Sequence, residues 1–87
     1  MRADHEKVSH QLKIARGQID GLLAMVEKDA YCIDVSNQLL ATIAVLKRVN
    51  AEVISSHLEH CVKEAQGEEE LDEKIAEIRA LMKRLSD

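Results

Sequence analysis

An uninterrupted helical pattern between the break at residues 29–32 and Gly67 constrains the fold more than any other part of the sequence. Its apolar residues recur at steps of three and four, which places them on one face of an α-helix. About 33 residues at about 1.5 Å each make a rod of roughly 50 Å, whereas a compact chain of 87 residues is only about 30 Å across. One chain cannot cover this stripe, so the sequence predicts homo-oligomerisation by antiparallel packing of long helices. The stripe consists of Ile33, Leu39, Leu40, Ile43, Leu46, Val49, Val53, Ile54, Leu58 and Cys61.

Two further amphipathic segments flank the long helix, so the sequence predicts an all-α fold with helices over about 4–28, 32–66 and 68–85. Asp4 is the expected N-cap of the first helix, and Gly67 the expected residue just past the end of the second. The chain contains no Pro, Phe or Trp and a single Tyr. This composition argues against a small β-barrel or sandwich.

Gly17 and Gly21 interrupt the first helix four residues apart on one face. Each costs about 1 kcal/mol relative to Ala in a helix interior. Either the helix tolerates them, or they mark the close approach of a neighbouring backbone. The sequence leaves both interpretations open.

Composition and charge exclude several classes of protein. Two Cys cannot form a disulfide framework, no apolar run approaches the roughly 20 residues that span a bilayer, and no signal peptide opens the chain. We therefore expect one cytoplasmic domain over residues 1–87, without membrane contact. No acid–base or nucleophile constellation stands out, so we expect no enzyme. The net charge is −4, but the acid excess lies in residues 49–87, which leaves a basic face in the first half possible.

Cys32, His57 and Cys61 are the residues of the sequence that could bind a soft metal ion. His57 and Cys61 are four apart on the predicted helix and project from one face. Cys32 lies roughly 37 Å away along that helix, so it could join them only from an antiparallel second copy. Two thiolates and one imidazole suit trigonal Cu(I) better than Zn(II), which prefers a fourth ligand. On spacing alone, two ordinary buried Cys and a surface His remain an alternative.

Three segments of the sequence resemble the CsoR/RcnR/FrmR family of bacterial repressors: residues 12–21 (LKIARGQIDG), 29–35 (DAYCIDV) and 57–61 (HLEHC). The resemblance covers nearly the whole chain and is closest to the copper-sensing CsoR type. It implies a three-helix protomer, an antiparallel four-helix-bundle dimer and a homotetramer. It further implies a repressor that binds operator DNA when metal-free and is released by Cu(I).

The same resemblance implies roles for individual residues. Cys32 would be a Cu(I) ligand from one protomer, and His57 and Cys61 the ligands from a second. Tyr31 and Glu77 stand where copper sensors keep residues that orient the ligands, with Glu77 acting through the far nitrogen of His57.

Lys13, Arg16, Lys47 and Arg48 are the expected phosphate contacts to DNA. Arg16 and Arg48 match basic positions that the family uses for DNA, whereas many members place Arg where this chain has Gln11. A tetramer would repeat these residues four times and sum weak contacts into a salt-sensitive surface.

Two other functions stay open at this point. A persulfide-sensing repressor on the same scaffold would use the two Cys, although such members lack the His that this chain has at position 57. A copper-binding helical oligomer that does not regulate DNA is the other alternative, favoured by Gln11 and the acidic balance. His5, His10 and His60 are expected to be solvent-exposed helix residues rather than ligands.

Overall fold

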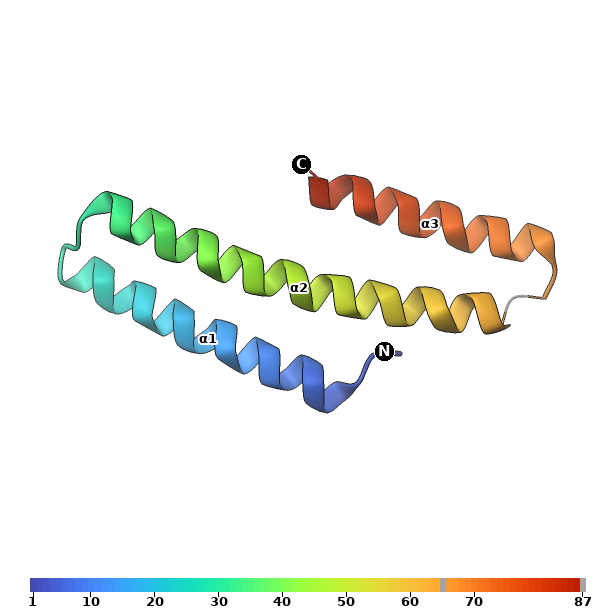
Figure 1. Cartoon of the computed structure of the whole chain (residues 1–87), viewed down its shortest axis with the longest axis horizontal. Helices are drawn as coiled ribbons and strands as arrows, with labels where there is room; N and C mark the ends of the chain where they lie inside the picture. The colour runs from blue at the N-terminus through green and yellow to red at the C-terminus, as the bar shows by residue number, and fades with distance from the viewer. Residues whose placement is uncertain (65, 87) are drawn as a thin grey trace. The chain divides into compact units, whose positions relative to one another are not determined.

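The computed structural model describes residues 1–64 and 66–86, with side chains to residue 84, and contains three helices in this part of the chain (Figure 1). They are α1 (His5–Glu27), α2 (Cys32–Glu64) and α3 (Glu68–Ser86). The predicted all-α fold is confirmed. Helix α2 ends at Glu64 rather than at 66, and residue 65 lies outside the described residues.

The structure groups the chain into two compact units, Asp4–Asn50 and Met1–Ala3 with the residues from Ala51 onward. In the first unit, α1 and the N-terminal part of α2 run side by side in opposite directions (Figure 1). In the second unit, α3 runs antiparallel to the C-terminal part of α2 (Figure 1). The prediction of a single domain over residues 1–87 stays a prediction.

Helix α1 begins where the sequence predicts. The side chain of Asp4 accepts hydrogen bonds from the backbone N–H groups of Glu6 and Lys7, at 3.0 and 3.3 Å. These bonds satisfy two of the amide donors that the first turn of a helix leaves without an intrahelical acceptor. Asp4 is thus confirmed as the N-cap of α1.

The connection between α1 and α2 turns on Asp29, which has a left-handed φ of 55°. The N–H of Ala30 donates to the carbonyl of Met25 at 2.9 Å, and the N–H of Asp29 to that of Val26 at 3.1 Å. This pair of bonds is the Schellman arrangement that closes a helix C-terminus. It reverses the chain, so that α2 starts at Cys32.

The contact between α1 and α2 in the first unit is narrow and mostly aliphatic. Its one buried polar side chain among the described residues, Thr42, donates from Oγ1 to Oε1 of Gln18 at 2.9 Å. A satisfied buried hydrogen bond of this kind fixes the register of two helices at little cost in stability. The buried apolar residues of the two helices are Val8, Ala15, Leu22, Val45 and Val49.

In the second unit, Gly67 directly precedes α3, which starts at Glu68, and α2 has already ended at Glu64. The φ of Gly67, 110°, is a conformation that L side chains rarely adopt, and its carbonyl accepts the first helical bond of α3 from the N–H of Leu71 at 3.2 Å. The side chain of Glu70 then accepts from the N–H of Gln66 at 3.1 Å. The expectation that Gly67 directly follows the end of α2 is therefore wrong, because its carbonyl is already part of the next helix.

Many large apolar side chains stay exposed in the protomer. Leu40, in the predicted stripe of α2, is 61% exposed, whereas Val49 of the same stripe is 6% exposed. No helix in residues 1–64 and 66–86 has the combined length and hydrophobicity needed to cross a bilayer. The other strongly exposed apolar residues of α1 and of the α2 stripe are Leu12, Ile14, Ile19, Leu23, Val26, Ile33, Leu39, Ile43 and Leu46.

Candidate metal centre and nucleic-acid interface

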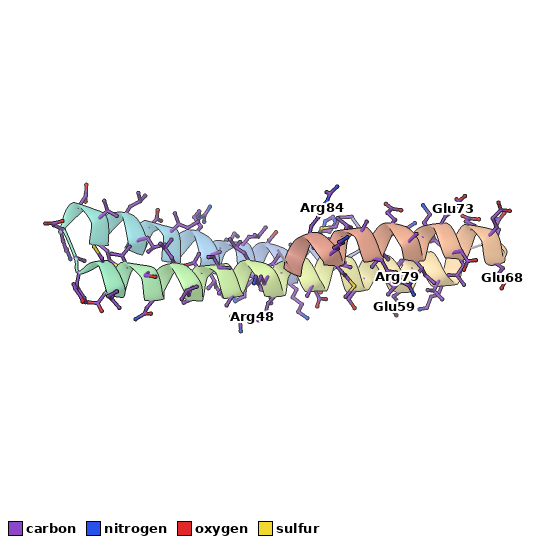
Figure 2. All side chains as sticks on the ribbon, turned by 90° about the horizontal axis from the view of Figure 1, so that it is seen from above. Arg48, Glu59, Glu68, Glu73, Arg79 and Arg84 are labelled. Atoms are coloured by element: carbon purple, nitrogen blue, oxygen red, sulfur yellow. The ribbon has the colours of Figure 1, made fainter. Side chains whose placement is uncertain are left out.

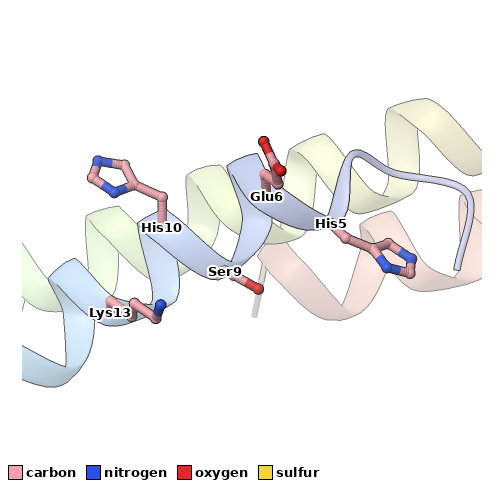
Figure 3. A pocket seen from close by; sticks show the side chains of 5 residues that line it. All are labelled: His5, Glu6, Ser9, His10 and Lys13. Atoms are coloured by element: carbon pink, nitrogen blue, oxygen red, sulfur yellow. The ribbon is translucent and has the colours of Figure 1, made fainter.

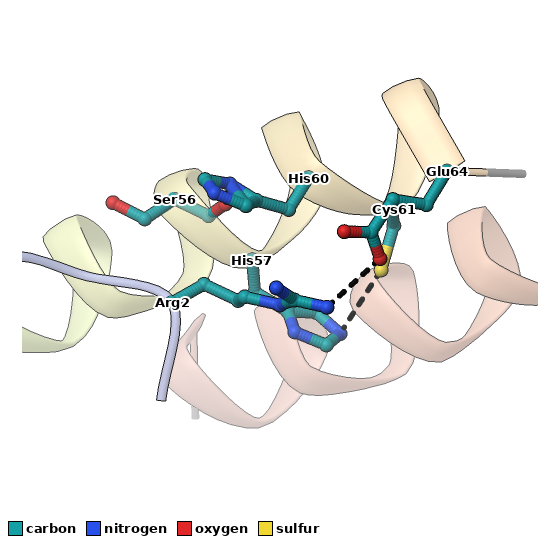
Figure 4. Close-up of polar contacts among 6 residues, drawn as sticks. All are labelled: Arg2, Ser56, His57, His60, Cys61 and Glu64. Carbon is teal, nitrogen blue, oxygen red and sulfur yellow. Dashed lines mark hydrogen bonds and ion pairs between the residues drawn. The ribbon is translucent and has the colours of Figure 1, made fainter.

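His57 and Cys61 form a close pair of soft donors on α2. The Cys61 Sγ lies 3.3 Å from the Nε2 of His57, and both residues are half-buried (Figure 4). Their spacing of four residues brings the side chains together on successive helical turns. A thiol and an imidazole at this distance can converge on one ion without any change of the backbone.

An ion pair borders this donor pair. The Arg2 guanidinium donates to the carboxylate of Glu64 at 2.8 Å (Figure 4), and both side chains are about half exposed. Arg2 also lines one small hollow together with His57 and Cys61. No local pattern in the sequence predicts this contact, because 62 positions separate the two residues.

His60 lines the same small hollow as His57 and Cys61, but its ring makes its hydrogen bond elsewhere. Its Nδ1 lies 3.1 Å from the backbone carbonyl of Ser56, one turn earlier on α2 (Figure 4). The residue is half-buried, so the prediction of an exposed His60 is wrong, since this hydrogen bond folds the ring back along its own helix. His5 and His10 are exposed, as predicted, and their rings point apart on α1 (Figure 3).

A second hollow beside His57 is lined by Glu77 of α3, together with Met1, Arg2 and Ile78. The carboxylate of Glu77 lies 4.0 Å from the Nζ of Lys74, a surface pair three residues apart. The orienting role that the family resemblance implies for Glu77, through a bond to His57, stays a prediction.

Tyr31 and Cys32 stand at the start of α2, and both are exposed. The carbonyl of Tyr31 accepts hydrogen bonds from the N–H groups of Asp34 and Val35, at 3.0 and 3.1 Å, which begins the helix. Cys32 is a free thiol that borders a shallow apolar hollow with Val26.

Within the described part of one chain, no three His, Cys, Asp or Glu side chains gather in a way that could hold a metal ion. The structure therefore brings together two of the three predicted ligands, His57 and Cys61. It does not bring Cys32 to them.

The four predicted DNA contacts all belong to the unit Asp4–Asn50, and all are exposed. Lys13 borders a shallow hollow on α1 beside Ser9 and His10 (Figure 3), and Arg48 stands on α2 (Figure 2). In residues 1–64 and 66–84, none of the four is engaged in an ion pair. Because these side chains form no ion pair within the protein, they can bind DNA phosphates without first breaking one. The four are Lys13, Arg16, Lys47 and Arg48.

Three helices and a His–Cys donor pair define an all-α protein equipped for a soft metal ion. Residues 4–84 match the metal-sensitive transcriptional repressor family, and the chain belongs to it. This membership confirms the resemblance carried by the three sequence segments.

Two relatives are named as copper sensors. The chain is 40% identical over 74 residues to the copper-sensing transcriptional repressor CsoR of Mycobacterium ulcerans, a match that covers 80% of this chain and 63% of that protein. The chain is also 37% identical over 82 residues to the copper-sensing transcriptional repressor RicR of Mycobacterium tuberculosis, with 92% of this chain and 85% of RicR covered.

A solved structure shares the fold. The crystal structure of the copper-sensing repressor CsoR with Cu(I) from Geobacillus thermodenitrificans matches with a TM-score of 0.81 and 32% sequence identity. The match covers 94% of this chain and 85% of that one. The three-helix architecture is therefore that of a known metal-responsive repressor.

Proposed function

We propose that the protein is a Cu(I)-responsive transcriptional repressor, which binds operator DNA when metal-free and leaves it when Cu(I) binds. The observation that carries this proposal is the contact of 3.3 Å between Cys61 Sγ and His57 Nε2 on one face of α2. Copper-sensing relatives and a Cu(I)-bound structural neighbour support the choice of metal. We place the protein in the cytoplasm, as a regulator rather than an enzyme.

The third Cu(I) ligand in this proposal is Cys32 of a second protomer. Cys32 is the first residue of α2, while His57 and Cys61 lie toward its other end. When two copies pack their α2 helices antiparallel, the start of each α2 lies beside the end of the other. This arrangement forms two equivalent sites. Two thiolates and an imidazole are the soft donors that Cu(I) prefers, and bound Cu(I) would supply a covalent link between the protomers.

Glu77 and Tyr31 orient the ligands in this proposal rather than binding the metal. Glu77 already lines the hollow that contains His57, and it comes from α3. A carboxylate that accepts the N–H of the non-ligating ring nitrogen fixes the tautomer of a ligand His and raises its basicity. Cu(I) would in this way couple α3 to α2.

The DNA surface of the proposed repressor consists of the exposed cations of the first unit. Lys13 and Arg16 are three apart on α1 and share a face, and Lys47 and Arg48 are adjacent on α2. A homotetramer presents this set four times, which sums individually weak phosphate contacts. Release follows from linkage: if Cu(I) weakens DNA binding, DNA weakens Cu(I) binding by the same factor, typically about 5- to 150-fold.

The test is gel retardation of the DNA upstream of the protein's own coding region, with and without Cu(I). We expect retardation by the metal-free protein at low salt and its loss with one Cu(I) per protomer. Retardation that Cu(I) leaves unchanged contradicts the copper response. If the fragment is not retarded at any salt concentration, the DNA-binding part of the proposal is contradicted, and a copper-binding helical oligomer is the alternative that remains.

A persulfide-sensing repressor is the second candidate, because Cys32 is an exposed free thiol. The two candidates differ in their need for the imidazole. In the variant His57→Ala, a thiol sensor still releases DNA on treatment with polysulfide, whereas a Cu(I) sensor no longer responds to copper. A wild-type protein that responds to polysulfide and not to Cu(I) would establish the second candidate.

A further inference from the structure

Gln11 and Gln18 face α2 from the same side of α1, seven residues or two helical turns apart. The two differ in one respect. The side-chain carbonyl of Gln18 accepts a hydrogen bond from Thr42 at 2.9 Å, whereas that of Gln11 is buried and has no hydrogen-bond partner. A buried acceptor without a donor lowers the stability of a folded protein. We therefore looked for a donor that could reach the Gln11 carbonyl in another state of the protein.

The candidate donor is Arg48. Gln11 and Arg48 line one hollow of about 200 Å³ between α1 and α2, with Ile14 and Val45 as its apolar walls. Arg48 is exposed, and the described residues offer it neither an ion pair nor a hydrogen bond. A guanidinium carries five N–H donors and no acceptor, so it can donate to Gln11 and still present a pair of N–H groups to a second acceptor.

We propose that Gln11 is a positioning residue for DNA binding: its side-chain carbonyl accepts an N–H of Arg48 and holds the guanidinium in place for a DNA phosphate. The proposal rests on the proposed function, in which Arg48 contacts DNA. Held on one side, the guanidinium keeps its remaining N–H groups aligned with phosphate oxygens, which bind this fork in bidentate fashion. The bond between Gln11 and Arg48 forms in the DNA complex, where it satisfies the acceptor that has no partner in the free protein.

A double-mutant cycle with Gln11→Met and Arg48→Ala tests this. Methionine has nearly the length of glutamine and lacks the carbonyl acceptor. Affinity for the upstream DNA fragment is measured by fluorescence anisotropy at several salt concentrations. We expect Gln11→Met to weaken binding about fivefold in the wild-type background and less than about twofold in the Arg48→Ala background. Both single variants should also show a shallower salt dependence, because both lose a well-placed phosphate contact.

Gln18→Met is the matched control, since it removes the same group from the same face of α1. It breaks the hydrogen bond with Thr42, so we expect a lower melting temperature and an unchanged salt dependence of DNA binding. Gln11→Met removes an unsatisfied acceptor, so its melting temperature should be equal to or above that of the wild type. A drop in melting temperature for Gln11→Met would assign Gln11 a structural role and overturn the proposal.

The remaining outcomes separate this inference from the proposed function. Equal losses from Gln11→Met in both backgrounds would mean that Gln11 acts independently of Arg48, which overturns the inference alone. The same holds if Arg48→Ala weakens binding and Gln11→Met has no effect. If the wild-type protein binds no DNA, or if Arg48→Ala binds as tightly as the wild type, the assigned DNA surface itself is wrong.

Discussion

At the scale of single residues, α2 carries one histidine that we propose as a metal ligand, His57, and a nearby one that we do not, His60. His57 contacts the Cys61 thiol at 3.3 Å, while the Nδ1–H of His60 donates to the backbone carbonyl of Ser56 at 3.1 Å. Both are half-buried, so exposure does not distinguish them. The direction of the ring does, and it makes the pair a natural test of the metal site.

We expect His57→Ala to lower Cu(I) affinity by at least about 100-fold, since it leaves two thiolates without the imidazole. The control His60→Ala should stay within about twofold of the wild type, because its ring bonds only to the backbone of α2. Competition with a chromophoric Cu(I) chelator measures both affinities. Equal losses in the two variants, or no loss in either, would contradict the ligand assignment.

The sequence predicts which residues carry the chemistry better than it predicts how they are held. The spacing of His57 and Cys61 places them on one face, because i and i+4 meet on any α-helix. The ion pair of Arg2 with Glu64 depends on a contact 62 positions apart, which no local pattern encodes. The missing hydrogen-bond partner of the Gln11 carbonyl cannot be predicted from the sequence either, because it depends on which residues of α2 lie opposite it.

At the scale of helices, local signals predict the starts and stops well. Asp4 caps α1 because its carboxylate reaches the amides of the next turn, and the break at residues 29–32 is a closed C-terminus followed by a new helix. The end of α2 is an exception, because the sequence predicts it at residue 66 and the helix ends at Glu64. A glycine followed by acidic residues is compatible with the end of one helix and with the start of the next. In the structure, the carbonyl of Gly67 accepts the first hydrogen bond of α3.

Gly17 and Gly21 allow a test of how α1 is used. A methyl group added at either position meets no atom within 4 Å, and both residues are exposed. We therefore expect Gly17→Ala and Gly21→Ala each to stabilise the protein by about 1 kcal/mol. Thermal unfolding followed by circular dichroism should show a midpoint several degrees higher.

Gly67→Ala is the matched control for these two substitutions. It also has open space around the added methyl group, but its φ of 110° strains an L side chain, so its midpoint should fall. A fall at Gly17 or Gly21 would contradict the prediction. It would show that a second copy of the chain approaches the backbone of α1 there, which is the other interpretation that the sequence left open.

At the scale of the whole molecule, the single chain leaves many of its large apolar side chains exposed, which supports the proposed assembly. Its apolar core residues are few, and among the described residues no large side chain is fully buried. Except for Val62, the exposed large apolar residues of α1 and α2 belong to the unit Asp4–Asn50, which also carries the free thiol of Cys32. Packing two such surfaces together would remove aliphatic area from water, at about 25 cal/mol per Å².

The assembly can be tested at Leu40, which is 61% exposed on α2. A glutamate there would lose the apolar burial and bring a carboxylate into the contact, on both sides of a twofold interface. We expect Leu40→Glu to weaken association by at least about 100-fold, and Leu40→Met, which keeps volume and polarity, to change it little. Sedimentation velocity over a range of protein concentrations measures both.

The same pair of variants connects assembly to the metal site. If Cys32 comes from a second protomer, a chain that cannot associate has only His57 and Cys61 to offer a Cu(I) ion. Leu40→Glu should then lose Cu(I) affinity at concentrations where it is monomeric and regain part of it at concentrations where it associates. Leu40→Met should bind like the wild type at all concentrations. Wild-type Cu(I) affinity in a monomeric Leu40→Glu protein would show that one chain completes the site by itself, and the shared site would have to be abandoned.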